Sequence, residues 1–272
     1  MKMVSKVLSI IILSLLLVGC SSSSVEKRVN KQLKKMTLDE KIGQMLVIYY
    51  TSVAYKDALD SAIKNVKPGG FILFKDNIVR VDQLMNFISQ IQEKSKIPMF
   101  IAIDQEGGIV QRLNNLQEGV TTIPTMQKIG ETNDEDLAYQ VGEIIAKELN
   151  VFGINMNFAP VLDININPDN TVIGSRAFGN NPEIVSKMGL AVAKGMKANR
   201  VIPVYKHFPG YGDTDVDPDY GLPVLNKTKE ELFELELKPF IEAINNGADI
   251  IMVGHIAVPK LTNDNTPASF SK

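Results

Sequence analysis

The chain has 272 residues, of which 44% are hydrophobic, and a formal net charge of -2 at pH 7. This length and composition suffice for one large globular domain with a buried core, and they argue against disorder. Basic and acidic residues are interspersed, so the chain lacks the basic stripe that neutralises nucleic-acid phosphates. We therefore expect no nucleic-acid partner, whereas a small neutral or polar ligand fits the composition.

The first twenty residues have the pattern of an export signal. Lys2 and Lys6 precede the apolar run VLSIIILSLLLV (Val7–Val18), which is short for a transmembrane helix and matches the core of a signal peptide. The alternative is an uncleaved membrane anchor, and both interpretations place the rest of the chain outside the cytoplasm. Because Cys20 is the only cysteine, an intrachain disulfide and a cysteine-based metal or redox site are excluded.

The end of the signal resembles a bacterial lipobox. Residues 17–20 read LVGC, and the resemblance implies that residues 1–20 are a lipoprotein signal peptide whose Cys20 carries the lipid. Residues 21–35 change from Ser-rich to charged, a composition that suits a tether at a membrane surface. We expect a lipid-anchored protein outside the cytoplasm, with its folded domain in residues 36–272.

Short apolar runs alternate with amphipathic helical patterns along this domain. The predicted buried strands are Met45–Tyr50, Gly69–Phe74, Pro98–Asp104, Ile154–Ile164, Val201–Phe208 and Ala248–Ile256. The predicted helices are Val81–Lys94, Asp134–Leu149, Pro182–Ala198 and Lys229–Asn246. Capping-box pairs mark two helix starts, Thr37 with Glu40 and Thr228 with Glu231.

This alternation predicts an α/β fold with a parallel sheet, either a barrel or an open doubly wound sheet. Neither GxGxxG nor GxxxxGK[ST] occurs in the chain, which disfavours a nucleotide-binding sheet. We therefore predict a TIM-type (β/α)8 barrel, of which about six of the eight βα units are present. Two missing units would leave unpaired sheet edges.

Polar side chains follow several predicted strands, where barrel enzymes carry their active sites. They are Asp104-Gln105-Glu106, Asp163, Lys206-His207 and His255. Each has a structural alternative, because a carboxylate after a strand can cap a helix and a lone histidine can be a hydrogen-bonded core residue. A metal held by Asp104, His207 and Asp213 is a further alternative, although the spacing matches no short metal motif.

Five longer motifs occur in order. They are IAIDQEGGIVQRL (Ile101–Leu113), NMNFAPVLDIN (Asn155–Asn165), NTVIGSRAFGNNPE (Asn170–Glu183), VIPVYKHFPGYGDTDVD (Val201–Asp217) and GADIIMVGHIAVPKL (Gly247–Leu261). Together they resemble the family 3 glycoside hydrolases, and within them the β-N-acetylglucosaminidases (β-N-acetylhexosaminidases) that trim cell-wall fragments. The resemblance covers Met36–Lys272. It implies a (β/α)8-type barrel that hydrolyses terminal β-linked N-acetylglucosamine from peptidoglycan-derived sugars with retention, without cofactor or metal.

The resemblance also implies which residues bind the sugar. Asp104 would accept a pair of hydroxyl protons and Arg112 would reach the same ring, while Arg176, Lys206 and His207 complete what we call the sugar cradle. These residue types agree with the chemistry, since a carboxylate accepts hydroxyl protons while Arg and Lys donate to oxygens. A neutral polyol suits this set better than a phosphate. A barrel enzyme acting on a phosphorylated sugar is disfavoured, because no phosphate loop is present.

The segment KHFPGYGDTDVDPDYGLP (residues 206–223) resembles the loop that carries the family's acid/base dyad of aspartate and histidine. Here the aspartate is Asp217, but Pro218-Asp219 replaces Ser-His, and Tyr211 replaces an earlier histidine. Asp219 can act as acid and base, as carboxylic acids do in most glycosidases. Alternatively it stays ionised, and the chain is an inactive, membrane-tethered muropeptide-binding protein. A merely solvated acidic loop is the structural alternative.

The family's nucleophile is an aspartate that follows a later helix and strand, beyond the point where this sequence stops at Lys272. No residue in the chain is assigned that role, although retention needs a second carboxylate roughly 5 Å from the acid. From the resemblance we expect the chain to be part of a longer reading frame, truncated at its C-terminus.

Overall fold

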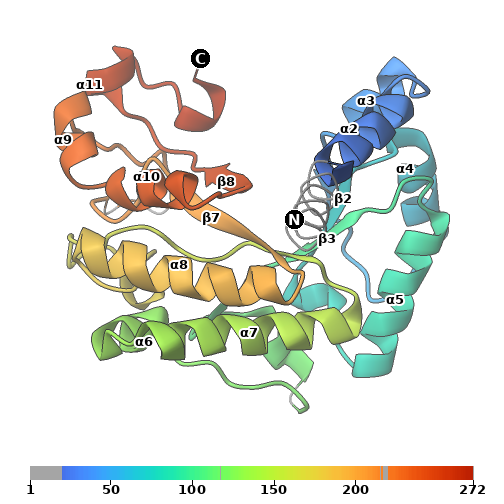
Figure 1. Cartoon of the computed structure of the whole chain (residues 1–272), viewed down its shortest axis with the longest axis horizontal. Coiled ribbons are helices and arrows are strands. Elements are labelled where there is room, and N and C mark those ends of the chain that lie inside the picture. The colour runs from blue at the N-terminus through green and yellow to red at the C-terminus, as the bar shows by residue number, and fades with distance from the viewer. Residues whose placement is uncertain (1–19, 117, 215, 217–219, 272) are drawn as a thin grey trace, which may run out of the picture.

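A curled parallel sheet forms the centre of the molecule (Figure 1). The computed structural model describes residues 20–116, 118–214, 216 and 220–271, with side chains from Ser24 onward. Within them the strand order is β1-β2-β3-β6-β7-β8. The strands are β1 (Val47–Ile48), β2 (Gly70–Leu73), β3 (Phe100–Ile103), β6 (Met156–Asn157), β7 (Ile202–Phe208) and β8 (Ile250–Val253). Each strand pairs in parallel with the next, as in a βα barrel, which confirms the predicted fold class.

Helices connect the strands. They are α2 (Cys20–Leu33), α3 (Leu38–Gly43), α4 (Asp57–Val66), α5 (Val81–Lys94), α6 (Met126–Thr132), α7 (Glu135–Phe152), α8 (Pro182–Ala198), α9 (Lys229–Glu234), α10 (Lys238–Asn245) and α11 (Pro259–Thr262). Both predicted capping boxes are confirmed, at Thr37 with Glu40 and at Thr228 with Glu231. The predicted bounds of α5 and α8 agree with the structure at both ends.

Strand side chains alternate between two apolar layers. Phe71 and Leu73 of β2 and Ile103 of β3 are fully buried in the core that includes α5, α7 and α8. Their sequence neighbours Ile72 and Ala102 belong to a separate cluster with residues of β6, β7 and β8. This period of two is expected for strands with opposite faces in different surroundings. It places one layer under the helices and the other on the inner side of the curled sheet.

Helices α7 and α8 lie side by side and approach each other closely through glycines (Figure 1). A Cβ atom on Gly142 of α7 would stand 2.0 Å from the carbonyl oxygen of Val192 in α8. In return, a Cβ on Gly195 of α8 would stand 2.2 Å from the carbonyl oxygen of Tyr139 in α7. The two backbones are therefore packed in direct contact, which only glycine permits at these positions.

The strands at the two edges of the sheet were predicted to be buried, but each has exposed side chains. The run Met45–Tyr50 was expected to be a buried strand, but only Val47–Ile48 pairs, and the side chains of Met45 and Val47 are 83% and 48% exposed. The reason is that β1 is a sheet edge among the described residues. Strand β8 is the other edge, and Val253 there is exposed as well.

Proline explains two further differences. The strand predicted over Ile154–Ile164 is continuous only at Met156–Asn157, with one isolated parallel bridge from Val161 to Lys206, and Pro160 between them lacks an N–H for the ladder. The helix predicted over Lys229–Asn246 is divided into α9 and α10, and Pro239 lies in the first turn of α10. Proline fits a first turn but not a helix interior, so one continuous helix cannot form.

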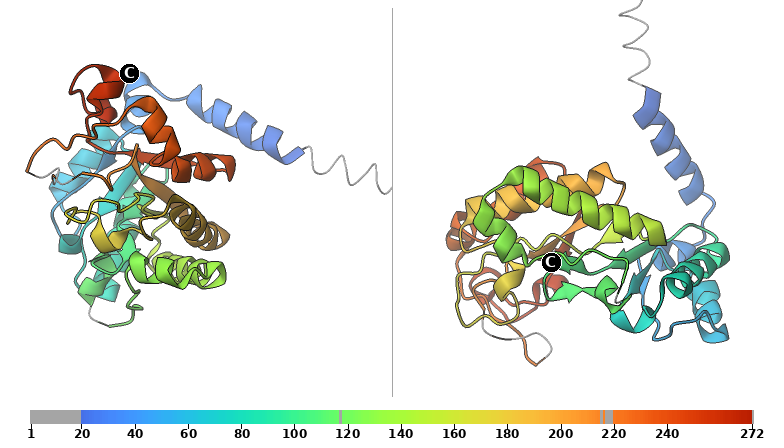
Figure 2. Two further views of the ribbon diagram at one scale, coloured as in Figure 1. Left: turned by 90° about the vertical axis from the view of Figure 1, so that its left-hand side faces the viewer. Right: turned by 90° about the horizontal axis from the view of Figure 1, so that it is seen from below.

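The N-terminal predictions fall largely outside the described residues, since residues 1–19 lie there. Cys20 is the first residue of α2, and its lipidation stays a prediction. Most of the predicted tether is helical, and α2 projects away from the rest of the molecule (Figure 2). Among the described residues, no helix combines the length and apolarity needed to cross a membrane.

We expect Gly142→Ala to destabilise the protein despite the better helix propensity of alanine. Relief of the glycine penalty alone would add about 1 kcal/mol to the free energy of unfolding. The added methyl group must instead push α8 away, at a cost of about 1–3 kcal/mol for an overpacked site. Urea denaturation measures the balance, with Gly195→Ala as the reciprocal probe. A rise in stability for both variants would contradict the close contact.

Candidate active site

A small hairpin after β3 builds the first part of the site. Strand β3 ends at Ile103, and β4 (Gln105–Gly107) and β5 (Val110–Gln111) then pair antiparallel. The chain reverses at Gly107 and Gly108, whose φ values are 121° and 58°. Such positive angles favour glycine. The reversal brings Arg112 back to Asp104, with 3.6 Å between Arg112 Nη2 and Asp104 Oδ2.

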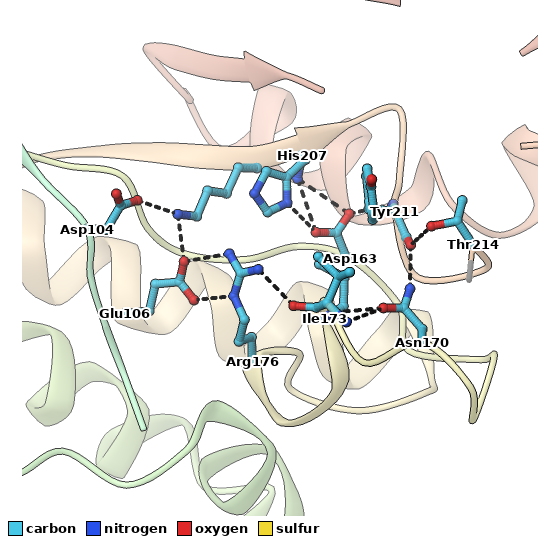
Figure 3. Close-up of polar contacts among 11 residues, drawn as sticks. Asp104, Glu106, Asp163, Asn170, Ile173, Arg176, His207, Tyr211 and Thr214 are labelled. Atoms are coloured by element: carbon cyan, nitrogen blue, oxygen red, sulfur yellow. Dashed lines mark hydrogen bonds and ion pairs between the residues drawn. The ribbon is translucent and has the colours of Figure 1, made fainter. Parts of the chain in front are cut away.

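Lys206 of β7 joins this hairpin to the far side of the sheet. Its side chain is only 2% exposed, and its ammonium lies 2.8 Å from Asp104 Oδ1 and 2.6 Å from Glu106 Oε1 (Figure 3). A buried ammonium needs such paired carboxylates, because desolvating a lone charge is costly. Lys206 thus fixes the end of β7 against the end of β3.

Glu106 also binds Arg176, which lies in the 3-10 turn η3 (Gly174–Arg176). Arg176 donates from Nε to Oε2 at 2.9 Å and from Nη2 to Oε1 at 2.8 Å, a bidentate pair (Figure 3). A third bond runs from Nη1 to the carbonyl oxygen of Val172 at 2.9 Å. Burial opposes ionisation of Glu106, but Lys206 and Arg176 outweigh it and lower the pKa of Glu106 from 4.5 to about 2.

Asp163 orients His207 and the backbone at Tyr211, in the segment predicted to be the acid/base loop (residues 206–223). The buried Asp163 carboxylate lies 2.7 Å from His207 Nδ1 and accepts the backbone N–H of Tyr211 at 2.6 Å (Figure 3). Because a carboxylate only accepts, this contact is a hydrogen bond from a protonated Nδ1, and it leaves Nε2 as the ring nitrogen for a ligand. The His207 side chain is 19% exposed, which leaves the ring edge accessible to a ligand.

Further contacts hold the described part of segment 206–223. Asn170 donates from Nδ2 to the carbonyl oxygen of Tyr211 at 2.7 Å, and the Thr214 hydroxyl donates to the same oxygen at 3.1 Å (Figure 3). Asp213 lies 2.9 Å from Lys227, which also pairs with the buried Glu236. Asp217 and Asp219 lie outside the described residues.

The charges of the site balance. Asp104, Glu106 and Asp163 supply three carboxylates, and three cations face them, Arg112, Arg176 and Lys206. Without His207, the formal charges of these six side chains sum to zero. This balance suits a ligand with many hydroxyl groups, because the three cations already have carboxylates nearby.

The alternative metal site is not supported by the surroundings of its donors. Asp104 pairs with Lys206, His207 with Asp163, and Asp213 with Lys227. Among the residues that the structure describes, no three histidine, cysteine or acidic side chains cluster closely enough to hold a metal ion. His255 contacts Ser269 through Nδ1 at 2.6 Å and is exposed, so it is hydrogen-bonded but not a core residue.

The structure thus brings all five residues of the sugar cradle to one end of the sheet. Sequence reasoning placed Glu106 and Asp163 at strand ends but gave them no role in the site. Glu106 precedes a Gly-Gly pair, which is a hairpin signal, and that signal indicates the reversal that returns Arg112 to Asp104. Asp163 had no comparable local signal, because its partners come 44 and 48 residues later.

A family model, the glycosyl hydrolase family 3 N-terminal domain, matches residues 37–272. The chain belongs to this family. The resemblance drawn from the five motifs is therefore confirmed over almost the whole expected domain.

Family 3 relatives cover much of the chain. Beta-hexosaminidase A of Pseudoalteromonas piscicida is 38% identical over 253 residues, which are 84% of this chain and 42% of the relative. A beta-hexosaminidase of Neisseria gonorrhoeae is 36% identical over 221 residues, 79% of this chain and 58% of the relative. The chain thus spans about half the length of these curated relatives.

Solved structures agree with this assignment. A glycoside hydrolase family 3 beta-N-acetylglucosaminidase from Paenibacillus sp. str. FPU-7 superposes with a TM-score of 0.82 at 39% identity, covering 86% of this chain and 45% of that one. NagZ from Neisseria gonorrhoeae in complex with N-trifluoroacetyl-D-glucosamine gives a TM-score of 0.77 at 33% identity, covering 83% and 67%.

Glu106→Gln should flatten the acid limb of the stability profile. The folded pKa of Glu106 is about 2 against 4.5 for the free group, so its contribution is complete above pH 4.5 and is lost as the pH falls towards 2. The shift corresponds to about 3 kcal/mol in the free energy of unfolding. Urea denaturation across this pH range measures the slope in the parent and in the variant.

The matched control is Glu230→Gln, because Glu230 is exposed on α9. This control should keep the acid slope of the parent protein. An unchanged slope in Glu106→Gln would mean that the buried ion pairs do not stabilise the fold.

Proposed function

We propose that the protein hydrolyses terminal, non-reducing β-linked N-acetylglucosamine residues of peptidoglycan-derived sugars with retention of configuration. The observation that carries this proposal is the internally paired sugar cradle at the carboxyl ends of the strands. Its relatives support the reaction class, since they are named beta-hexosaminidases. The bound N-trifluoroacetyl-D-glucosamine of one structural relative supports the sugar.

The exposed fractions divide the cradle into two roles. Arg112, His207 and Asp104 have side chains that are 29%, 19% and 14% exposed, and we assign them the direct contacts with sugar hydroxyls. Asp104 accepts hydroxyl protons, Arg112 donates, and His207 accepts at Nε2. Lys206 is nearly inaccessible and Arg176 has three bonds within the protein. We assign both mainly to holding Asp104 and Glu106 in place.

Proton transfer is assigned to the acid/base loop. In the sequence, the described contacts at Tyr211 and Asp213 are followed by Asp217 and Asp219, and Asp219 occupies the motif position where the resembled enzymes have a histidine. A carboxylic acid there would protonate the leaving oxygen and later deprotonate the attacking water. The glycosyl group meanwhile bonds to a second carboxylate, which retention requires. We assign that nucleophile to no residue of this chain.

Two substitutions separate binding from chemistry. Asp219→Asn should lower the turnover of a chromogenic β-N-acetylglucosaminide by about 10²–10⁴-fold, because the general acid is lost. It should leave the affinity for N-acetylglucosamine unchanged. Asp104→Asn should weaken that affinity by roughly 10–100-fold, because hydrogen bonds to a charged acceptor are lost. Aglycone release and calorimetric binding by the native protein measure the two effects.

Asp169→Asn is the control, since Asp169 is an exposed acid outside the cradle. Sugar binding without aglycone release in the parent protein would instead support the inactive, tethered muropeptide-binding protein. Inorganic phosphate that competes with the sugar would favour an enzyme acting on phosphorylated sugars. Full turnover in Asp219→Asn would remove Asp219 from the mechanism.

We also propose that the protein is exported and lipid-anchored to the bacterial cell membrane through Cys20. The motif LVGC and the preceding apolar run support this placement. Cells fed radioactive palmitate should label the parent chain, and Cys20→Ala should abolish the label because the modified thiol is gone. Equal labelling of both chains would contradict the anchor.

A further inference from the structure

Helix α2 carries an apolar stripe that the fold does not bury. Val25, Val29 and Leu33 are spaced four residues apart, so they share one face of the helix. Their exposed fractions are 57%, 51% and 43%, and every described side chain of α2 from Ser24 to Leu33 is exposed. An amphipathic helix in a globular protein normally turns such a stripe into the core. In α2 the stripe lies open to the surroundings.

The opposite face of α2 and the turn after it are basic. The basic residues of this segment are Lys27, Arg28, Lys31, Lys34 and Lys35, whereas Glu26 is the only acid from Ser24 to Met36. The whole chain has a net charge of -2, so this positive charge is a local concentration. A helix with an apolar stripe and a Lys/Arg-rich polar face has the pattern of a segment that lies in a membrane interface.

A cavity of about 380 Å³ at the end of α2 extends the basic region. Its lining includes five lysines, Lys35, Lys64, Lys67, Lys94 and Lys96. Glu40 pairs with Lys96 at 2.7 Å, and Asp60 pairs with Lys64 at 2.6 Å. Within the described part of the chain, Lys35 and Lys94 form no ion pair with a carboxylate. The cavity therefore keeps an excess of positive charge.

The cavity lies at the amino ends of the strands. Pro68 precedes β2 and Met99 precedes β3, and both line it. The sugar cradle lies at the carboxyl ends, so the two sites occupy opposite ends of the sheet. Gln32 of α2 and Lys35 just after it line the cavity, so a surface that receives the stripe of α2 also comes close to these lysines.

We propose that α2 and the five cavity lysines form a docking surface for anionic phospholipid headgroups. In this arrangement Val25, Val29 and Leu33 enter the boundary between headgroups and acyl chains. The lysines contact lipid phosphates, and the sugar cradle faces away from the membrane. Charge complementarity selects this partner, because an uncharged apolar partner would supply no counter-ion to Lys35 and Lys94, which have no carboxylate partner in the described part of the chain.

Tryptophan fluorescence tests the surface, because the full chain contains no tryptophan. In full-length Leu33→Trp, vesicles of phosphatidylcholine mixed with phosphatidylglycerol should shift the emission to the blue, and brominated acyl chains should quench it. Vesicles of phosphatidylcholine alone should give much smaller changes. The apolar run Val7–Val18 would act equally with both lipids, so the difference between them reports the basic surface.

Two reporters control for position. Val29→Trp lies on the same stripe and should behave like Leu33→Trp, which guards against a local defect at one site. Ile109→Trp lies at the tip of the β4–β5 hairpin, where Ile109 is 70% exposed at the carboxyl end of the sheet. Its emission should not respond to either vesicle. An emission shift of Ile109→Trp equal to that of Leu33→Trp would overturn the proposed orientation.

A charge series tests the lysines. Combining Leu33→Trp with Lys31→Gln, Lys64→Gln and Lys94→Gln should weaken binding to the anionic vesicles on the order of 100-fold, from the usual contribution of each basic residue near a charged surface. The matched control combines Leu33→Trp with Lys128→Gln, Lys147→Gln and Lys229→Gln. These three lysines are exposed, and the control should bind anionic vesicles like Leu33→Trp alone. Equal losses in the two triple variants would overturn the proposal.

Three further outcomes would also overturn it. Equal emission shifts with both lipid compositions would mean that the stripe binds membranes without the lysines. A shift caused by inorganic phosphate alone would make the cavity a site for free phosphate. A shift that depends on protein concentration without vesicles would mean that a second copy of the chain covers the stripe.

Discussion

The site depends on one buried carboxylate, that of Glu106, held between the ammonium of Lys206 and the guanidinium of Arg176. These three groups come from the hairpin after β3, from β7 and from the turn η3. None of them could remain charged in the interior alone, because desolvation would exceed what the fold can compensate. Together they fix the distance between segments that are 70 to 100 residues apart in the chain.

The elements of the fold were largely predictable, and the polar network was not. Alternating apolar runs and capping pairs such as Thr37 with Glu40 are local signals, so they predicted helices and strands well. The predictions were wrong at Pro160 and Pro239, where one predicted strand is shortened and one predicted helix is divided. At both positions the apolar pattern continues across a residue that cannot donate a backbone hydrogen bond. The exposure of β1 was not predicted. It follows from the position of β1 at the edge of the sheet, and that position cannot be inferred from the local sequence.

For the site, residue types and family motifs indicated Asp104, Arg112, Arg176, Lys206 and His207, and the fold brings them together. The pairing among them could not be predicted. A carboxylate that follows a strand can bind a ligand, cap a helix or neutralise a buried cation, and only the fold decides which. For this reason no role in the site was predicted for Glu106. Its side chain is 1% exposed and pairs with Lys206 and Arg176, the two least accessible cations of the cradle.

Asp163 ties a side chain and a backbone segment to one group. The same carboxylate holds the ring of His207 and accepts the backbone N–H of Tyr211. Any change that moves the His207 ring therefore alters the acceptor on which the backbone at Tyr211 depends. Thermodynamic linkage makes the effect mutual, because a shift of the Tyr211 backbone also changes the contact that orients His207. One shared acceptor thus couples the orientation of a partly exposed ring to the position of the chain that follows β7.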